Sequence, residues 1–401
     1  MSRMLFVSTD CHAGLLPGAY REYLDPQYRE AYDADVAVQL EIAKENRKVM
    51  LVEDINAKWR QGIEQELTGA WDQAQRLQVL DGDGIAAEVI FPDGITENNA
   101  PPFGAGLSVG PLGGERETQW AGARAHNRWI AELSQMAPDR HLGVAVVPAT
   151  WDVDEAVREV RWARDNGLRS IMIPVMWGPH SPYHHPKYEP LWATCEDLDV
   201  VIHFHSGPAP AEDYFGPMPR RPGHQDLLGG MGIYVCEAVW AVVRPLTFLI
   251  WGGVFERHPK LKVVVTEATT TWAANYFEHL DDRYVDWHVT AKLGDYKSHL
   301  SMKPSEYFHR NIRLGTFFGR KEVERRHEVG HHCMMWGSDY PHPEGTWPKT
   351  RDAMAEAFRG VPEAEIATML GGSAAAFYGI DTEKLAPLVE RIGPDTSLFE
   401  A

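Results

Sequence analysis

The chain contains few cysteines, four in 401 residues, and none occurs in a Cys-x-x-Cys spacing. Cys11, Cys195, Cys236 and Cys333 lie far apart in apolar or strand-like contexts, so we expect reduced core thiols. This scarcity excludes a fold held together by disulfides, and it also excludes an organised thiolate site for an iron-sulfur cluster.

Long apolar runs are missing as well. No stretch approaches the roughly 18 residues expected of a membrane-spanning helix, and residues 1–7 are too short for the apolar region of a secretory signal. Basic clusters are absent, and 39 basic against 57 acidic side chains give a net charge of −18. This balance argues against nucleic acid or an anionic membrane as a partner, and we expect a cytoplasmic protein.

No Gly-x-Gly-x-x-Gly motif follows a strand, which disfavours a doubly wound dinucleotide-binding sheet. Instead, short apolar segments alternate with helical ones, and we expect strands at residues 4–7, 84–92, 142–148, 169–175, 199–205, 261–266, 312–318 and 333–339. This pattern favours the α/β class, specifically a (β/α)8 TIM barrel. We expect one barrel domain over residues 1–385 and a C-terminal tail over 386–401, with a long helical excursion over residues 15–80 after the first strand, acting as a lid or an interface.

Polar side chains end several of these apolar strands. Strand side chains alternate between faces, so Asp10 with His12, and His203 with His205, would each point a pair of polar groups to one side. Glu267 follows three valines and a threonine, and a buried carboxylate at that position requires a cation or a hydrogen-bond donor. In a parallel barrel, polar residues at the carboxyl ends of apolar strands are typical of an active site.

These fragments supply six potential metal ligands, namely Asp10, His12, His203, His205, Glu267 and Asp339. A catalytic zinc usually takes about three protein ligands, so either some of the six are acids and bases beside the metal or the pocket holds two metals. Nitrogen and oxygen donors suit zinc, manganese or ferrous iron, and the sequence does not choose among them.

Simpler roles remain open for several of these residues. Glu267 could form a salt bridge, and Asp339 could be a helix cap or a catalytic base. Glu88 could pair with an arginine in the barrel wall, and His342 could bond a backbone carbonyl. The adjacent pairs at 184–185 and 331–332 point to opposite faces, so we do not expect either pair to share a ligand set.

Several fragments carry a family resemblance: Asp10-x-His12, His205-Ser206-Gly207, residues 253–267 with Trp272 behind them, and Gly337-Ser338-Asp339-Tyr340-Pro341-His342. In combination and order they resemble the amidohydrolase superfamily, in the branch that also contains nonoxidative decarboxylases. The resemblance implies a TIM barrel with one metal ion held by Asp10, His12, His205 and Asp339.

Two features depart from that pattern: Asp-x-His replaces the commoner His-x-His on the first strand, and His203 is additional. The opening residues 9–14 and 20–26 resemble an offshoot of this fold that includes the nonheme diiron monooxygenase of platensimycin and platencin biosynthesis. That resemblance implies two iron ions that activate dioxygen to hydroxylate a diterpenoid carried as a coenzyme A thioester.

We therefore take a diiron monooxygenase of secondary metabolism as the leading hypothesis, with the six ligands divided between two irons and with Asp339, Glu267 and His205 as catalytic residues. No flavin or nicotinamide motif is visible, so an external reductase or another electron donor would be required. Aromatic loops with Trp177, Tyr183, Tyr214, Phe215 and Trp347 would form a hydrophobic substrate pocket or simply pack together.

The alternative is a mononuclear zinc or manganese hydrolase or nonoxidative decarboxylase, in which Asp339 transfers a proton. A third hypothesis is a barrel that binds a ligand without turnover. The composition and the long excursion are also compatible with a homodimer.

Overall fold

The computed structural model describes residues 3–50, 53–93, 100–107, 115–207, 230–285 and 292–400, without the side chains of residues 42–56 and 230–231. Eight parallel strands pair in sequence order to form a nearly closed barrel, as predicted. They are β1 (Phe6–Ala13), β2 (Ile85–Pro92), β3 (His141–Val146), β4 (Ser170–Met172), β5 (Val201–His205), β6 (Lys262–Thr266), β7 (Ile312–Thr316) and β8 (Met334–Trp336).

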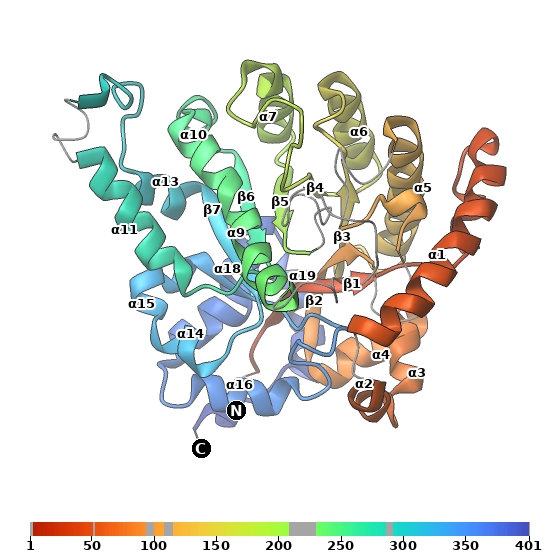
Figure 1. Cartoon of the computed structure of the whole chain (residues 1–401). Helices are drawn as coiled ribbons and strands as arrows, with labels where there is room; N and C mark the ends of the chain where they lie inside the picture. Colours follow the sequence, from red (N-terminus) through yellow and green to blue (C-terminus); the bar gives the residue numbers. More distant parts are fainter. Residues whose placement is uncertain are drawn as a thin grey trace.

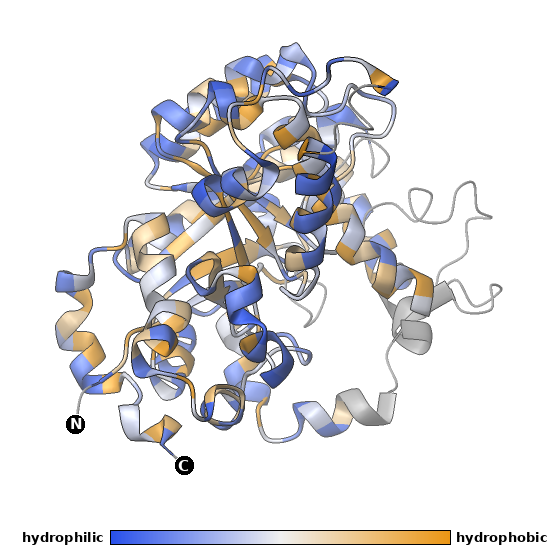
Figure 2. Cartoon of the chain, turned by 90° about the vertical axis from the view of Figure 1, so that its left-hand side faces the viewer, coloured by the Kyte–Doolittle hydropathy of each residue, from blue (hydrophilic) through white to orange (hydrophobic). Residues whose placement is uncertain are grey.

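Helices surround the strands (Figure 1) and cover their apolar outer faces. They are α1 (Arg29–Met50), α2 (Glu53–Arg60), α3 (Glu64–Leu67), α4 (Gln73–Asp83), α5 (Arg116–Met136), α6 (Val153–Asp165), α7 (Glu189–Asp197), α9 (Gly230–Trp251), α10 (Val254–Arg257), α11 (Trp272–Val285), α13 (Pro304–Asn311), α14 (Arg320–Glu324), α15 (Arg326–Val329), α16 (Thr350–Phe358), α17 (Glu363–Ala367), α18 (Ser373–Tyr378) and α19 (Thr382–Ile392). Figure 2 shows hydrophobic strands at the centre and largely hydrophilic outer surfaces.

Most of the strands are shorter than predicted, β4 (Ser170–Met172) most clearly, and two differences, in β1 and β8, affect the site. β1 continues through Asp10 and His12 to Ala13, all of it buried, although these residues are polar. β8 ends at Trp336, because the backbone then turns across β1: the Asp339 amide donates to the Asp10 carbonyl at 2.7 Å, and the His12 amide donates to the Tyr340 carbonyl at 2.6 Å. These bonds close the barrel between its first and last strands.

Gly337 permits this close approach of the first and last strands. A Cβ atom at Gly337 would lie 2.3 Å from the Asp10 Cβ and 3.0 Å from the Asp10 amide nitrogen. Only glycine fits there without displacing a candidate ligand.

Helices α1 to α4 occupy the stretch after β1 where we predicted a helical excursion. At the other end of the chain, the predicted boundary at residue 385 falls inside α19. The following segment bonds to the start of the barrel, since the Met4 amide donates to the Pro394 carbonyl at 2.9 Å. The division into a domain and a tail stays a prediction.

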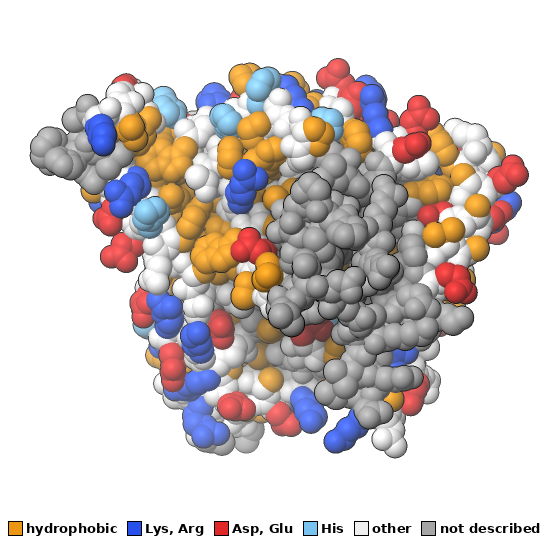
Figure 3. Space-filling model, in the orientation of Figure 1, with side chains coloured by type: hydrophobic (Ala, Val, Ile, Leu, Met, Phe, Trp, Pro, Cys, Tyr) orange, Lys and Arg blue, Asp and Glu red, His pale blue; other side chains and the backbone are white. Residues whose placement is uncertain are grey.

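Helix α9 is the most apolar helix near the surface. The expectation that no stretch approaches the length of a membrane span was wrong, because Gly232–Trp251 is long and apolar enough to cross one, with 39% of its most apolar window buried inside the protein. Core helices of soluble proteins pass the same test, so length and composition alone do not indicate a membrane span. Hydrophobic side chains gather over this region in Figure 3, among them the exposed Ile233, Val235 and Trp240. Cys236 on the same helix is exposed, so the expectation of four core thiols holds only for the other three, which are buried and free.

Candidate metal centre

Five of the six predicted ligands lie at the carboxyl ends of the barrel strands: Glu267, which follows β6, and four that are more deeply buried. Asp10 and His12 come from β1, His205 ends β5, and Asp339 follows β8. Because all eight strands run parallel, these ends meet at one mouth of the barrel. The four side chains are 0–2% exposed.

The imidazoles and carboxylates lie too close together to be independent. His12 Nε2 is 3.5 Å from Asp10 Oδ1 and 3.4 Å from Asp339 Oδ1, and His205 Nε2 is 3.3 Å from Asp10 Oδ1. His342 stacks on His12 with ring centroids 4.0 Å apart, and its Nδ1 is 2.9 Å from Asp339 Oδ1. Glu267 Oε2 lies 3.5 Å from His205 Nδ1.

Backbone carbonyls orient the imidazoles of His12 and His205. His12 Nδ1 lies 3.2 Å from the Pro92 carbonyl, and His205 Nδ1 lies 2.5 Å from the Ser206 carbonyl. Since a carbonyl only accepts, both Nδ1 atoms carry the proton and both Nε2 atoms point their lone pairs to the centre. This arrangement is typical of histidines that ligate a metal.

Two buried oxygens at this centre, Asp10 Oδ2 and Asp339 Oδ2, have no hydrogen-bond partner among the described residues, and His12 Nε2 makes only contacts of 3.4 and 3.5 Å with carboxylate oxygens. Unpaired buried polar atoms are costly, and here lone pairs face lone pairs. One divalent cation would satisfy them. The donor set of two nitrogens and two carboxylates suits zinc or manganese, so these residues fit a metal ion.

The charges of the centre point the same way. Burial would lower the pKa of His12, but the Asp10 and Asp339 carboxylates raise it to about 10. Burial and the charges of Asp339 and Asp10 raise the pKa of Glu267 well above its ordinary value. Burial would also raise the pKa of Asp339, yet His342 and His12 hold it far below. The carboxylates thus create a negative field that a proton or a cation must balance.

The backbone at two site residues adopts a rare conformation. Glu267 has φ 56° and Asp339 has φ 58°, in the left-handed region that residues with a Cβ seldom occupy. Each follows the last residue or residues of a strand and turns its carboxylate into the mouth. Strain of this kind is typical of functional sites, where surrounding contacts maintain it.

The structure does not bring His203 to the other ligands. Its Nδ1 lies 3.1 Å from Thr266 Oγ1, its Nε2 lies 3.4 Å from Tyr378 Oη, and its ring stacks on Tyr378. Burial and the neighbouring His205 lower the pKa of His203 well below its ordinary value, so it is neutral. His203 is absent from the groups of metal-capable side chains within the described part of the chain. His203 therefore does not contribute to the surplus of ligands that suggested a second metal.

His342 and Glu344 are the residues that the sequence analysis undervalued. His342 joins both His12 and Asp339, and Glu344 lies with Glu267, Asp339 and His342 in a group whose ligand atoms are all within 4.8 Å. The signal was available for His342, because it follows Asp339 by three residues, and a short turn returns its side chain to that carboxylate.

Glu88 pairs with an arginine, as the simpler alternative held, but the arginine comes from the excursion. Arg76 of α4 binds Glu88 with Nε at 2.6 Å and Nη2 at 2.8 Å, and His141 Nδ1 lies 2.9 Å from the same carboxylate. Arg76 Nη1 also donates to the His12 carbonyl at 2.9 Å. This buried pair anchors the excursion directly behind a candidate ligand.

The aromatic loop residues that lie in the described regions pack on one another. Trp177 contacts Tyr183, Phe248 and Arg244, and Trp347 stacks edge-on against Tyr340. The other two, at positions 214 and 215, lie outside the described residues.

Comparisons with known proteins identify the family to which this chain belongs. A family model described as amidohydrolase matches residues 9–380. A gamma-resorcylate decarboxylase of Rhodococcus jostii is 29% identical over 169 residues, 38% of this chain and 46% of that protein, so the match spans less than half of that relative. A gamma-resorcylate decarboxylase of Polaromonas sp. is 24% identical over 67% of this chain and 77% of its own.

Solved structures share the fold. An amidohydrolase from Mycobacterium avium subsp. paratuberculosis superposes with a TM-score of 0.68 at 17% identity, over 96% of this chain and 100% of that one. A dihydroxybenzoic acid decarboxylase from Polaromonas sp., solved with bound manganese and the inhibitor 2-nitroresorcinol, gives a TM-score of 0.60 at 17% identity, over 94% and 97%.

These findings overturn the leading hypothesis from the sequence. The similar proteins are decarboxylases and amidohydrolases, and one contains manganese, so the diiron monooxygenase, its two irons and its oxidoreductase class are wrong. The predicted dioxygen, electron donor and coenzyme A thioester substrate were parts of that hypothesis, so these predictions are wrong as well. The error came from counting His203 among the metal ligands and from weighting a short opening fragment above the order of motifs along the whole barrel.

Proposed function

Since this chain belongs to the amidohydrolase family, we propose that it is a metal-dependent nonoxidative decarboxylase of aromatic or similarly unsaturated carboxylic acids. The observation that carries the proposal is the convergence of buried imidazole and carboxylate groups, among which Asp10 Oδ2 and Asp339 Oδ2 lack partners in the described part of the chain. The decarboxylases among the similar proteins support the substrate class.

Asp10, His12, His205 and Asp339 would hold one divalent ion, zinc or manganese. When bound, that ion supplies positive charge that fixes the substrate carboxylate or a neighbouring hydroxyl. The reaction needs no oxidant: the bond to the carboxyl carbon breaks, its electron pair stays on the substrate carbon, carbon dioxide leaves, and a proton takes its place.

The protein's own residues can deliver that proton. Asp339 is fully buried, whereas His342, whose side chain is 11% exposed, contacts it with Nδ1 2.9 Å from Oδ1. His342 therefore connects a buried carboxyl group to the solvent side of the mouth, and we assign Asp339 and His342 to proton transfer. Burial and the Asp339 and Asp10 carboxylates raise the pKa of Glu267, and in its protonated form Glu267 can donate a hydrogen bond to a substrate oxygen.

The test is carbon dioxide release from gamma-resorcylate and a panel of related hydroxybenzoates by manganese-loaded protein. In heavy water the product should carry one deuterium at the carbon that lost the carboxyl group. Asp339→Asn should lower the rate by roughly 100-fold or more, the usual cost of losing an acid or base. Glu356→Gln, an exposed acid on α16, is the matched control and should leave the rate unchanged.

Two results would contradict the proposal. One is a manganese-loaded protein that releases no carbon dioxide from any acid of the panel and does not bind 2-nitroresorcinol. The other is hydrolysis of amide or lactone substrates without decarboxylation, which would assign the same metal site to a hydrolase.

A further inference from the structure

A second group of metal-ligating side chains lies at the opposite, amino-terminal end of the barrel. His309 is in the last turn of α13, which leads into β7, whereas His332 and Cys333 form the turn directly before β8. β7 and β8 are parallel neighbours, with Leu314 paired to Met334. The segments that enter these strands are therefore side by side, although they are distant in sequence.

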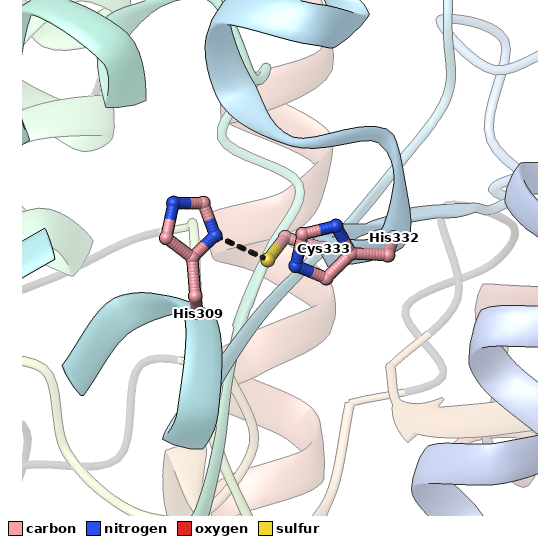
Figure 4. Close-up of side chains that lie close together, drawn as sticks. All are labelled: His309, His332 and Cys333. Carbon is pink, nitrogen blue, oxygen red and sulfur yellow. Dashed lines mark hydrogen bonds between the residues drawn. The ribbon is translucent and has the colours of Figure 1, made fainter. Parts of the chain in front are cut away.

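The three side chains point toward one another (Figure 4). His309 Nδ1 lies 3.4 Å from Cys333 Sγ, and the two imidazole centroids are 5.2 Å apart. One ligand atom from each of the three residues lies within 4.8 Å of the others. Ligands of a tetrahedral zinc ion lie roughly 3.3–3.8 Å apart, given bonds of about 2.0–2.3 Å. His332 is exposed, so its side chain is free of the core packing that would fix it in one position.

The backbone around the cluster is held in place. The Cys333 amide donates to the Gly330 carbonyl at 2.8 Å, and Ser373 Oγ donates to the His332 carbonyl at 3.0 Å. Gly330 has φ 93°, and a Cβ there would come within 2.9 Å of the His309 ring and 3.2 Å of the His332 ring. Both imidazoles thus pack against the backbone of Gly330, and the hydrogen bonds described above fix the backbone of the turn that carries His332 and Cys333.

The charges nearby act in two directions. Burial, together with the Arg313 guanidinium, lowers the pKa of His309, and burial with His309 and Arg313 lowers that of His332, so both imidazoles are neutral and can ligate. Burial raises the pKa of the Cys333 thiol to about 11, although the Arg313 guanidinium, whose Nη1 lies 3.9 Å from Sγ, lowers it, so a metal ion must displace the thiol proton. The same guanidinium repels a cation. Arg313 and His332 also line a cavity of 660 Å³, where solvent screens that repulsion.

We propose that His309, His332 and Cys333 form a second metal site that takes one zinc-like divalent ion through two imidazole nitrogens and one thiolate. Two nitrogens and a sulfur select a borderline metal such as zinc over magnesium or calcium, and water completes the tetrahedron. Binding releases the thiol proton to solvent. The ion joins α13 to the turn before β8, at the end of the barrel away from the candidate metal centre.

Cobalt(II) is the probe that separates the two sites. The centre at the carboxyl end offers only nitrogen and oxygen ligands in the described chain, whereas this cluster includes a thiolate. Metal-free protein titrated with cobalt under anaerobic conditions should therefore show a near-ultraviolet thiolate-to-cobalt charge-transfer band together with two bound equivalents. A hydrogen-bonded cluster without a metal would show neither the band nor the second equivalent.

Cys333→Ser should abolish the band and one equivalent of cobalt. His309→Ala should weaken binding by more than the roughly 10–100-fold that loss of an outer partner costs. His331→Ala, in the same turn but outside the cluster, and Cys236→Ser, which removes the exposed thiol, should both keep the band.

The centre at the other end of the barrel serves as an internal reference. His12→Ala should remove the other equivalent while keeping the thiolate band, so failure of one site is distinguishable from failure of the other. Wild-type protein with no charge-transfer band at saturating cobalt would overturn the inference, as would a band that persists in Cys333→Ser. His332→Ala checks the same point with an exposed residue, in case Cys333→Ser disturbs folding.

Discussion

The buried pair of Arg76 and Glu88 offers the sharpest test of how the excursion supports the barrel. Both side chains are 0% exposed and their bonds are bidentate, at 2.6 and 2.8 Å. Glu88→Gln keeps the shape of the side chain but leaves the guanidinium without a counter-charge. Breaking a buried pair in this way typically costs about 3–5 kcal/mol.

The pKa of Glu88 gives an independent magnitude. Burial would raise it, but Arg76 and His141 lower it from 4.5 to about 2. A shift of that size corresponds to about 3 kcal/mol, at 1.36 kcal/mol per unit. Because the folded-state pKa is depressed, this stabilisation is present above about pH 4.5 and is lost as the pH falls toward 2. The typical cost of breaking a buried ion pair and the pKa shift of Glu88 therefore give the same order of magnitude for the free energy that the pair contributes.

The assay is equilibrium urea unfolding at pH 7 of wild type, Glu88→Gln, Arg76→Met and the double variant, at fixed manganese. We expect the double variant to be clearly more stable than the sum of the two single losses predicts, because no charge is left unpaired. Manganese affinity should fall in Arg76→Met, since Arg76 also bonds the His12 carbonyl. If Glu88→Gln changes stability by less than about 0.5 kcal/mol, or if the losses add, the pair does not anchor the excursion.

Two further predictions concern a buried acid and a tight contact. Burial outweighs the Thr350 hydrogen bond and Arg351 and raises the pKa of Asp83 from 3.8 to about 6, so Asp83 favours the folded state at low pH and this stabilisation is lost as the pH rises through 6. Asp83→Asn should therefore raise the melting temperature at pH 8 but not at pH 4, and identical pH profiles would exclude this role. Gly337→Ala should cost about 1–3 kcal/mol by overpacking and weaken manganese binding, because its Cβ would strike Asp10. Gly82→Ala, which meets nothing within 4 Å, is the control, and equal effects of the two substitutions would show that Asp10 can move without penalty.

The sequence located most of the barrel. Short apolar segments alternating with helical ones predicted the eight strands, since parallel strands buried on both faces are continuously hydrophobic. It placed Asp10 and His12 at the end of the first strand, whereas β1 runs through both to Ala13, because their neighbours on β5 and after β8 keep them in the barrel. The pattern of hydrophobic residues predicts which residues are buried. It does not predict the burial of a polar residue whose partners come from elsewhere in the chain.

The candidate metal ligands were likewise predicted only in part from the sequence. Alternation along a strand put His203 and His205 on one face, but it could not tell which of them reaches the mouth and which meets Tyr378 inside the barrel. Adjacent His331 and His332 diverge along the chain, as expected, yet His332 meets His309 from another segment. Local geometry fixes the direction of a side chain, whereas its partner depends on which strands lie next to each other.

The sequence alone determined the fold class, the acidic balance and the chemical kinds of ligand available, because these follow from composition and from the period of each element. Tertiary structure decided which ligands share an ion: parallel pairing brings Asp10, His205 and Asp339 to one end of the barrel, and His309 with Cys333 to the other. Distances between residues hundreds of positions apart are set by strand order and closure, which no local pattern encodes.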